Sequence, residues 1–134
     1  METTLKALIA DHAGDARAIG APGRDWLTYD GLRSLAGEVA TSLNGMGIDA
    51  ADRVAIVLPN GPEMATAFAT VAQAATTAPL NPAYREEEYA FYLEDLQSKA
   101  LLVAEGYDGP AYAAAKGLGK NVIRLHVPEG APAG

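Results

Sequence analysis

Apolar residues recur along this chain with the spacing of a strand in some segments and with the spacing of a helix in others. The clearest change from one to the other lies in residues 53–82. A short β-branched run from Val54 to Leu58 is typical of a strand that is buried on both faces of a parallel sheet. In the turn that follows, Asn60 is a good helix N-cap, and Pro62 suits the first helical position because it has no N–H to satisfy. An alanine-rich segment and a second short apolar run complete the stretch, which predicts a β-α-β crossover.

The helix of this crossover lacks a polar face. No residue from Met64 to Tyr84 carries a charge, and a helix that is small and apolar all round needs cover from other parts of the protein on more than one side. The segment approaches the length of a membrane span, but it contains four threonines, Gln73, Asn81 and two prolines, so we expect no membrane span. We expect instead that the isolated chain buries this surface by self-association.

Three elements are predicted before the crossover. Residues from Leu5 to His12 follow helical spacing and predict a short amphipathic helix. Residues 17–20 and 26–28 predict two short strands of a hairpin around a Pro-Gly turn. Thr28 then caps an amphipathic helix from about Tyr29 to Met46.

Short elements alternate again after the crossover. The pattern predicts a helix from about Arg85 to Leu96, a strand over 99–103, a helix over 107–117 and a last strand over 121–125. Residues 127–134 are rich in Pro, Gly and Ala. Such a tail is expected to be mobile and to contribute nothing to a core.

Four strands that alternate with helices from Arg53 onward predict an α/β fold. We expect a mostly parallel sheet that is flanked by helices on both faces, with an N-terminal helix and a small hairpin. The Arg53 strand is placed centrally, and the later strands step outward. One domain is the default for 134 residues, with residues 1–126 as its body and residues 127–134 as a flexible tail.

The composition narrows the classes of function. The net charge of −7 and the pI near 4.7 argue against nucleic acid and anionic membrane surfaces as partners, because both select basic patches. The absence of cysteine excludes disulfides, thiolate catalysis and Cys-ligated zinc. The N-terminus has neither the basic region nor the continuous apolar region of a secretory signal, which favours a cytoplasmic protein.

Phosphate-binding loops are not evident. A nucleotide-binding α/β protein is expected to carry a glycine-rich loop between a strand and a helix, where N–H groups approach phosphates. The turn at residues 59–63 has two prolines and a glutamate in that place. The Gly117–Lys120 segment precedes a strand and is more typical of a helix end. Neither stretch predicts a phosphate cradle.

The acidic residues and the histidines indicate no reaction either. Glu86–Glu88, Glu94 and Asp95 fall on an exposed face of their predicted helix, where a solvated surface is a simpler interpretation than acid-base chemistry. His12 fits the apolar face of the first helix, and His126 follows a strand as a candidate base without an identifiable partner. The residues alone therefore indicate a soluble α/β domain and no particular activity.

Four stretches carry a resemblance to a known family. They are LTYDGL at 27–32, DRVAIVLPNGPEM at 52–64, APLNPAY at 78–84 and FYLEDLQSKALLV at 91–103. Their order and spacing resemble the N-terminal region of adenylate-forming acyl-CoA synthetases, and within that family the fatty-acid and oxalate type branch. The resemblance implies a full-length enzyme that binds ATP and magnesium, converts a carboxylic acid into an acyl-adenylate and transfers the acyl group to coenzyme A.

The same resemblance implies that the principal catalytic groups lie outside this chain. Family members are several times longer, and their ATP loop, their adenine- and magnesium-binding motif, their acyl pocket and their catalytic lysine follow the matched region. We therefore expect a leading fragment of such an enzyme, inactive alone and without bound cofactors. The alternative is a free-standing noncatalytic α/β module that acts in binding or assembly.

One departure from the family pattern concerns Arg85. Related sequences often have Thr or Ser here, with a glutamate three residues later in the position of Glu88, and these two residues form a capping box. Arginine has no acceptor for the N–H of Glu88, so the box is incomplete. Some relatives hold the coenzyme A phosphate with basic residues from this neighbourhood, and the resemblance makes Arg85 a candidate for that contact. A solvated surface charge is the alternative.

Overall fold

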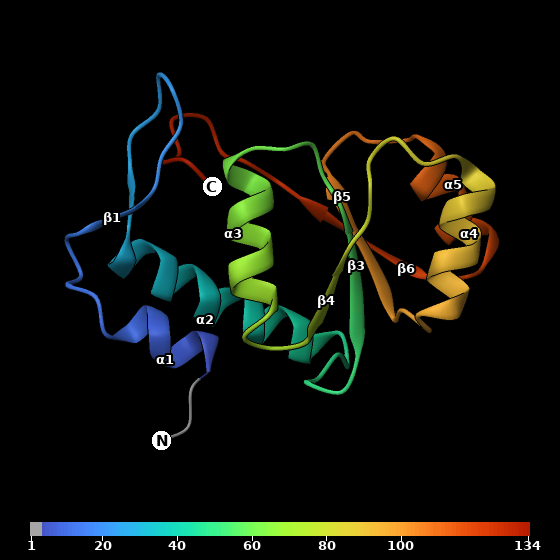
Figure 1. The fold of residues 1–134 in the computed structure, drawn as a ribbon, viewed down its shortest axis with the longest axis horizontal. Coiled ribbons are helices and arrows are strands. Elements are labelled where there is room, and N and C mark those ends of the chain that lie inside the picture. Colours follow the sequence, from blue (N-terminus) through green and yellow to red (C-terminus); the bar gives the residue numbers. More distant parts are fainter. Residues whose placement is uncertain (1–3) are drawn as a thin grey trace.

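Four parallel strands form the centre of the molecule (Figure 1). The computed structural model of the chain describes residues 4–134. The strands are β3 (Arg53–Val57), β4 (Thr76–Pro79), β5 (Ala100–Ala104) and β6 (Asn121–Leu125), in the order β4-β3-β5-β6. Every neighbouring pair is parallel, as crossover connections require. The expected α/β fold, with the Arg53 strand inside the sheet, is confirmed.

Helices cover the two faces of this sheet in pairs. Helices α2 (Tyr29–Gly45) and α3 (Pro62–Val71) pack together over one face, and α4 (Glu86–Asp95) and α5 (Pro110–Gly117) pack together over the other. Strand residues alternate between the two faces with the period of a strand. From the first central strand, the α2–α3 core takes Val54, Ile56 and Leu58, and the α4–α5 core takes Ala55 and Val57.

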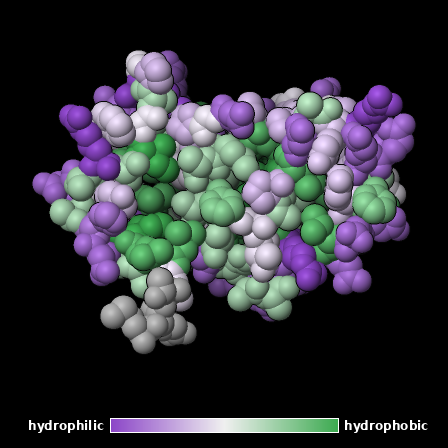
Figure 2. Space-filling view, viewed as in Figure 1, coloured by the Kyte–Doolittle hydropathy of each residue, from purple (hydrophilic) through white to green (hydrophobic). Residues whose placement is uncertain are grey.

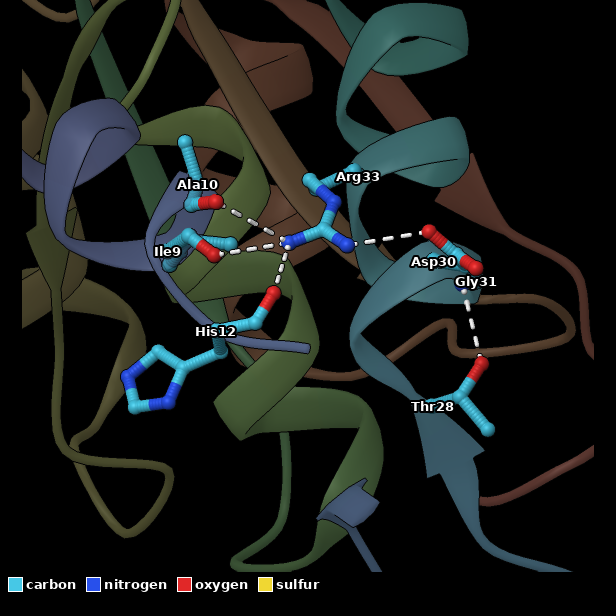
Figure 3. A network of polar contacts seen from close by, with 7 residues as sticks. All are labelled: Ile9, Ala10, His12, Thr28, Asp30, Gly31 and Arg33. Atoms are coloured by element: carbon cyan, nitrogen blue, oxygen red, sulfur yellow. Dashed lines mark hydrogen bonds and ion pairs between the residues drawn. The ribbon is translucent and has the colours of Figure 1, made fainter. Parts of the chain in front are cut away.

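The N-terminal part adds a helix and a hairpin beside α2. Helix α1 (Leu5–Ala10) is followed by β1 (Arg17–Ile19), which pairs with β2 (Leu27–Thr28) in antiparallel orientation. These elements share a small third core with α2. The expected helix, hairpin and Thr28 cap are confirmed, since the Thr28 hydroxyl accepts the N–H of Gly31 (Figure 3).

Arg33 fastens α1 to α2. Its guanidinium faces three carbonyl oxygens at and beyond the C-terminal end of α1, and it donates to those of Ile9 at 3.0 Å and His12 at 2.9 Å (Figure 3). The other guanidinium nitrogen donates to Asp30 Oδ1 at 2.9 Å. Because the last carbonyls of a helix have no partner within it, Arg33 supplies the hydrogen bonds that α1 lacks.

Helix α3 is covered on three sides, which explains why it carries no charge after Glu63. Helix α2 packs on one side and the sheet lies beneath, while Ala69 joins the third core together with Ile9 and Leu27. The outer side still exposes 44% of Phe68, and Figure 2 shows apolar residues gathered over this part of the surface. Within residues 4–134, no helix is both long enough and apolar enough to cross a membrane.

Two predictions at the ends of elements are wrong. The N-cap of α3 is Gly61 and not Asn60, and it makes no side-chain hydrogen bond. Helix α1 ends at Ala10, so His12 lies beyond the helix. The His12 ring stacks on the ring of Tyr29, with centroids 4.2 Å apart, and is therefore not part of the apolar face of α1.

Residues 127–134 make contacts that the sequence did not predict. Ala133 is fully buried, and its N–H donates to the carbonyl oxygen of Asp25 at 2.9 Å. The expectation that this segment adds nothing to the packed interior is therefore wrong. Its mobility stays a prediction.

Candidate site at the carboxyl edge of the sheet

The helices that follow the neighbouring strands β3 and β5 lie on opposite faces of the sheet. A crevice lies at this point, on the carboxyl edge of the sheet. Helix α3 follows β3 on one face, whereas α5 follows β5 on the opposite face. Ligands of open α/β sheets bind at such topological switch points. The crevice has a volume of about 410 Å³ and is lined by residues 58–63 after β3, by Ala104 and Glu105 at the end of β5, and by Leu125 and Val127 at the end of β6.

Glu63 lies in the crevice and pairs with Arg24 from the hairpin turn. Only 27% of the Arg24 side chain and 25% of the Glu63 side chain are exposed. Partial burial raises the pKa of the Glu63 carboxyl, but hydrogen bonds from the Arg24 guanidinium and from its own backbone N–H outweigh burial and hold the pKa below its usual value. Glu63 is therefore a charged partner of Arg24 at neutral pH.

A second pair joins the ends of β5 and β6. Residues Ala104 and Leu125 are register neighbours, so the residues that follow them, Glu105 and His126, meet at the edge of the sheet. The His126 Nδ1 contacts the Glu105 carboxylate. His126 therefore has a partner, Glu105, that the sequence analysis did not identify. The contact could have been predicted, because both residues directly follow adjacent parallel strands. Both side chains are 64% exposed, which makes the pair a surface contact.

The crevice does not fit ATP or magnesium. Phosphate sites at helix starts use free backbone N–H groups, but Pro62 has none and the Glu63 carboxylate would repel a phosphate. In the part of the chain that the structure describes, no group of three or more His, Cys, Asp or Glu side chains is placed to hold a metal ion. No step of an ATP-dependent reaction is assigned to this crevice.

A larger hollow, the α2–α3 groove, lies between α2, α3 and β6. It has a volume of about 610 Å³, and its walls include Leu35 from α2, Met46 directly after that helix, Val71 from α3 and Ile123 from β6. The buried hydroxyl of Thr66 also lines it and has no hydrogen-bond partner among the described residues. Apolar walls with an isolated polar group are typical of surfaces that receive a small ligand or an apolar segment of protein.

Arg85 does not line the crevice or the groove, and it is the N-cap of α4. Its backbone N–H donates to Glu88 Oε2 at 2.8 Å, so the Glu88 half of the capping box is formed, while the guanidinium offers no acceptor for the other half. The Arg85 side chain is exposed. The preceding loop is held by Asn81, which accepts the N–H of Ala83 on its side chain and the Tyr89 hydroxyl on its carbonyl.

Two of the sequence interpretations are confirmed nearby. Glu86–Glu88, Glu94 and Asp95 are all exposed, as expected of a solvated helix face. The Gly117–Lys120 segment ends α5, and Gly119 has a φ of +69°, a left-handed conformation that glycine adopts without strain. Neither feature lines the crevice or the α2–α3 groove.

Known proteins of similar sequence and fold indicate where this domain occurs. The profile of the family described as AMP-binding enzyme matches residues 7–132. The oxalate–CoA ligase of Arabidopsis thaliana is 40% identical over 120 residues, which cover 86% of this chain and 23% of the relative. A probable CoA ligase of Humulus lupulus is 35% identical over 129 residues, which cover 96% of this chain and 25% of the relative.

Solved structures agree with the sequence matches. The crystal structure of apo MatB from Rhodopseudomonas palustris matches with a TM-score of 0.78 and 26% identity, over 96% of this chain and 26% of that one. The chain spans about a quarter of the length of the curated relatives that it matches. With a family profile that covers nearly all of its residues, the chain belongs to the AMP-binding enzyme family.

Proposed function

We propose that this chain is the N-terminal scaffold of an ATP-dependent acyl-CoA synthetase. The full-length enzyme converts a carboxylic acid and ATP into an acyl-adenylate, with magnesium as the metal ion, and then transfers the acyl group to the thiol of coenzyme A. The match of residues 7–132 to the AMP-binding enzyme profile carries the proposal. A cytoplasmic location goes with it, because both ATP and coenzyme A are available there.

The isolated chain is proposed to be inactive. This follows from the chemistry of its carboxyl edge, where Pro62 and Glu63 offer no phosphate cradle. At that edge the Glu63 carboxylate is neutralised by Arg24, and Glu105 and His126 form an exposed surface contact. They shape the surface and do not activate a nucleophile.

A chimeric enzyme tests the proposal. The chain replaces the matched N-terminal quarter of the Arabidopsis thaliana oxalate–CoA ligase, and oxalate-dependent release of pyrophosphate and formation of a CoA thioester are measured. We expect both activities in the chimera and neither in the isolated chain. Pyrophosphate release by the isolated chain, or a chimera that melts cooperatively but forms no adenylate, contradicts the proposal.

The second candidate function is a free-standing noncatalytic module, and the reading frame after Gly134 distinguishes it from the scaffold of an enzyme. If the reading frame stops after Gly134, the chain acts without the remaining three-quarters of a ligase, and a binding or assembly role replaces the enzymatic one. If the frame continues into a loop rich in Ser, Thr and Gly, the scaffold role is supported.

Arg85 is proposed to contact a phosphate of coenzyme A. The support is its exposed position at the start of α4 and the suitability of a guanidinium for phosphate. In the chimera, Arg85→Ala is expected to raise the KM for coenzyme A about fivefold to tenfold, while Arg85→Lys raises it less. Dephospho-coenzyme A shows which phosphate is involved. An unchanged KM for coenzyme A in Arg85→Ala rules out this contact.

Self-association of the isolated chain is proposed through the outer side of α3. Phe68 is 44% exposed there and Leu8 of α1 is 54% exposed, and Figure 2 shows apolar surface over both helices. Apolar patches of this kind mark contact surfaces. Sedimentation at rising concentration is expected to show dimers or larger species, and Phe68→Ser is expected to reduce them. A strict monomer at high concentration contradicts this proposal.

A further inference from the structure

Residues 127–134 form a strap across the carboxyl edge of the sheet. After β6 the chain passes over the start of α3 toward the hairpin (Figure 1). Two backbone contacts hold its end, because the carbonyl oxygen of Pro132 accepts from Arg24 Nη2 at 2.7 Å and the N–H of Ala133 donates to Asp25. Ala133 is fully buried as a result.

Arg24 is the point where three separate segments meet. It lies in the hairpin turn, it pairs with Glu63 in the first turn of α3, and it donates to Pro132 in the strap. A guanidinium has several N–H donors in a fixed fork, so one side chain holds two acceptors in different directions at once. The Glu63 carboxylate fixes the guanidinium, and the guanidinium in turn fixes the strap.

The strap is a wall that the crevice and the α2–α3 groove share. Val127 lines both hollows, and Pro128, Ala131, Pro132 and Gly134 line the groove. Gly134 closes tightly on Thr66, because a Cβ on this glycine would lie 1.9 Å from the Thr66 hydroxyl. Movement of the strap away from α3 therefore joins the two hollows and uncovers the apolar groove.

We propose that residues 127–134 act as a latched strap whose release opens the α2–α3 groove. The latch is Arg24, held in place by Glu63 and closed on the carbonyl oxygen of Pro132. In the latched state the strap is ordered against α3 and the hairpin. The mobility that its composition predicts belongs to the released state. The proposal concerns contacts within this chain and does not depend on the proposed enzymatic activity.

Hydrogen exchange of the Ala133 N–H measures the latch directly in the isolated chain. Arg24→Met keeps the apolar stem but removes the donors, and it is expected to speed this exchange about tenfold to a hundredfold, as for loss of a charge-assisted hydrogen bond. Arg24→Lys is expected to give an intermediate rate, because one ammonium does not hold both acceptors in the same geometry. Glu63→Gln leaves the Pro132 contact in place and is expected to give a smaller increase.

Arg17→Met is the matched control. Arg17 lies on the same hairpin and stacks over the Trp26 ring at 5.4 Å, and within residues 4–134 its side chain makes no hydrogen bond or ion pair with the strap. It is expected to leave the exchange at Ala133 unchanged. Binding of an anilinonaphthalene sulfonate dye supplies a second readout, which is expected to rise in Arg24→Met and not in Arg17→Met, because only latch release uncovers the groove.

Two results overturn the latched strap. The first is an Ala133 exchange rate in Arg24→Met equal to that of the parent chain. The second is an equal acceleration at Ala133 and at the amides of β3 and β5, which reports global destabilisation and no local release. If Arg24→Met does not fold, the same comparison is made with Arg24→Lys and Glu63→Gln, and unchanged exchange in both contradicts the proposal.

Discussion

The two faces of the central sheet differ in how completely they are covered. On the α4–α5 face all nine residues of the core are buried, and Tyr89, Leu93, Leu101 and Val103 have no exposed surface. On the α2–α3 face ten core residues are buried as well, and both cores end in half-buried residues of β6, Val122 on one face and Ile123 and Leu125 on the other, but the α2–α3 groove opens beside Ile123 and Leu125. One face is finished by residues of this chain, while the other leaves apolar surface for something else to cover.

The cause lies in the side chains of the covering helices. Helix α5 presents the small residues Ala111, Ala114 and Ala115 to the sheet, so it approaches closely, and Tyr89 from α4 fills the space beside it. Helix α2 is longer, but Met46 directly after it remains 48% exposed, and the α2–α3 groove lies between this helix and β6. Stability is therefore expected to reside on the α4–α5 face, and change in shape on the α2–α3 face.

Truncation of one core residue on each face is the strongest test of this difference. Leu93→Ala removes a fully buried side chain from the α4–α5 face and is expected to cost about 3 to 4 kcal/mol of unfolding free energy. Ile123→Ala on the α2–α3 face is expected to cost about 1 kcal/mol, because that side chain is only partly buried. Urea unfolding measures both. Equal costs contradict the comparison.

The next largest effect is expected from the loss of Arg33, which stabilises the contact between α1 and α2 on the α2–α3 side of the sheet. Arg33→Met removes the hydrogen bonds to the end of α1 and to Asp30, and we expect a loss of about 1 to 2 kcal/mol. Amides of α1 are expected to exchange faster while those of α4 do not change. Asp30→Asn is the control for the ion pair alone, which is exposed and contributes little. Uniformly faster exchange in both helices contradicts a local role for Arg33.

The fold was predictable wherever short-range patterns determine it. The run from Val54 to Leu58, the Thr28 cap and the helix from about Arg85 to Leu96 each follow from neighbouring residues, and each is confirmed. The fold class followed from the alternation of strands and helices. The Asn60 cap failed because Pro62 takes the first helical position, which makes the residue directly before it, Gly61, the N-cap.

The contacts at the carboxyl edge were not predictable in the same way. Arg24 and Glu63 are 39 residues apart, and no local pattern pairs an arginine in a turn with an acid in a helix. Ala133 is buried where its N–H donates to Asp25 in the hairpin turn, and a tail rich in Pro and Gly gave no sign of this contact. Glu105 and His126 were closer to prediction, because residues directly after adjacent parallel strands meet at the sheet edge.

A fall in pH is expected to weaken contacts on the α2–α3 face before it weakens those on the α4–α5 face. The folded pKa of Glu63 lies below its usual value of 4.5, so its pairing with Arg24 stabilises the fold above that pH, and the contribution is lost as the pH falls below 4.5 through the folded pKa. Protection of the Ala133 N–H against exchange, corrected for the intrinsic rate at each pH, is expected to fall over this window more than the protection of amides in β5. Glu63→Gln is expected to lose the pH dependence at Ala133. If it keeps the full dependence, another carboxylate is responsible.

The smallest expected effect concerns the N-cap of α4, one of the two helices that cover the α4–α5 face. Glu88 already accepts the N–H of Arg85, so a serine at position 85 supplies the missing acceptor for the N–H of Glu88 and completes the box. Arg85→Ser is expected to stabilise the chain by about 0.5 to 1 kcal/mol, measured by urea unfolding.

Arg85→Ala separates the cap from the charge. It removes a cation from the positive end of the helix without adding an acceptor, so it is expected to give only a few tenths of a kcal/mol. If Arg85→Ser is no more stable than Arg85→Ala, the cap does not account for the gain. In the chimeric enzyme, both substitutions are expected to raise the KM for coenzyme A. A more stable protein with weaker coenzyme A binding would mean that Arg85 occupies the cap position for binding, at the expense of the helix.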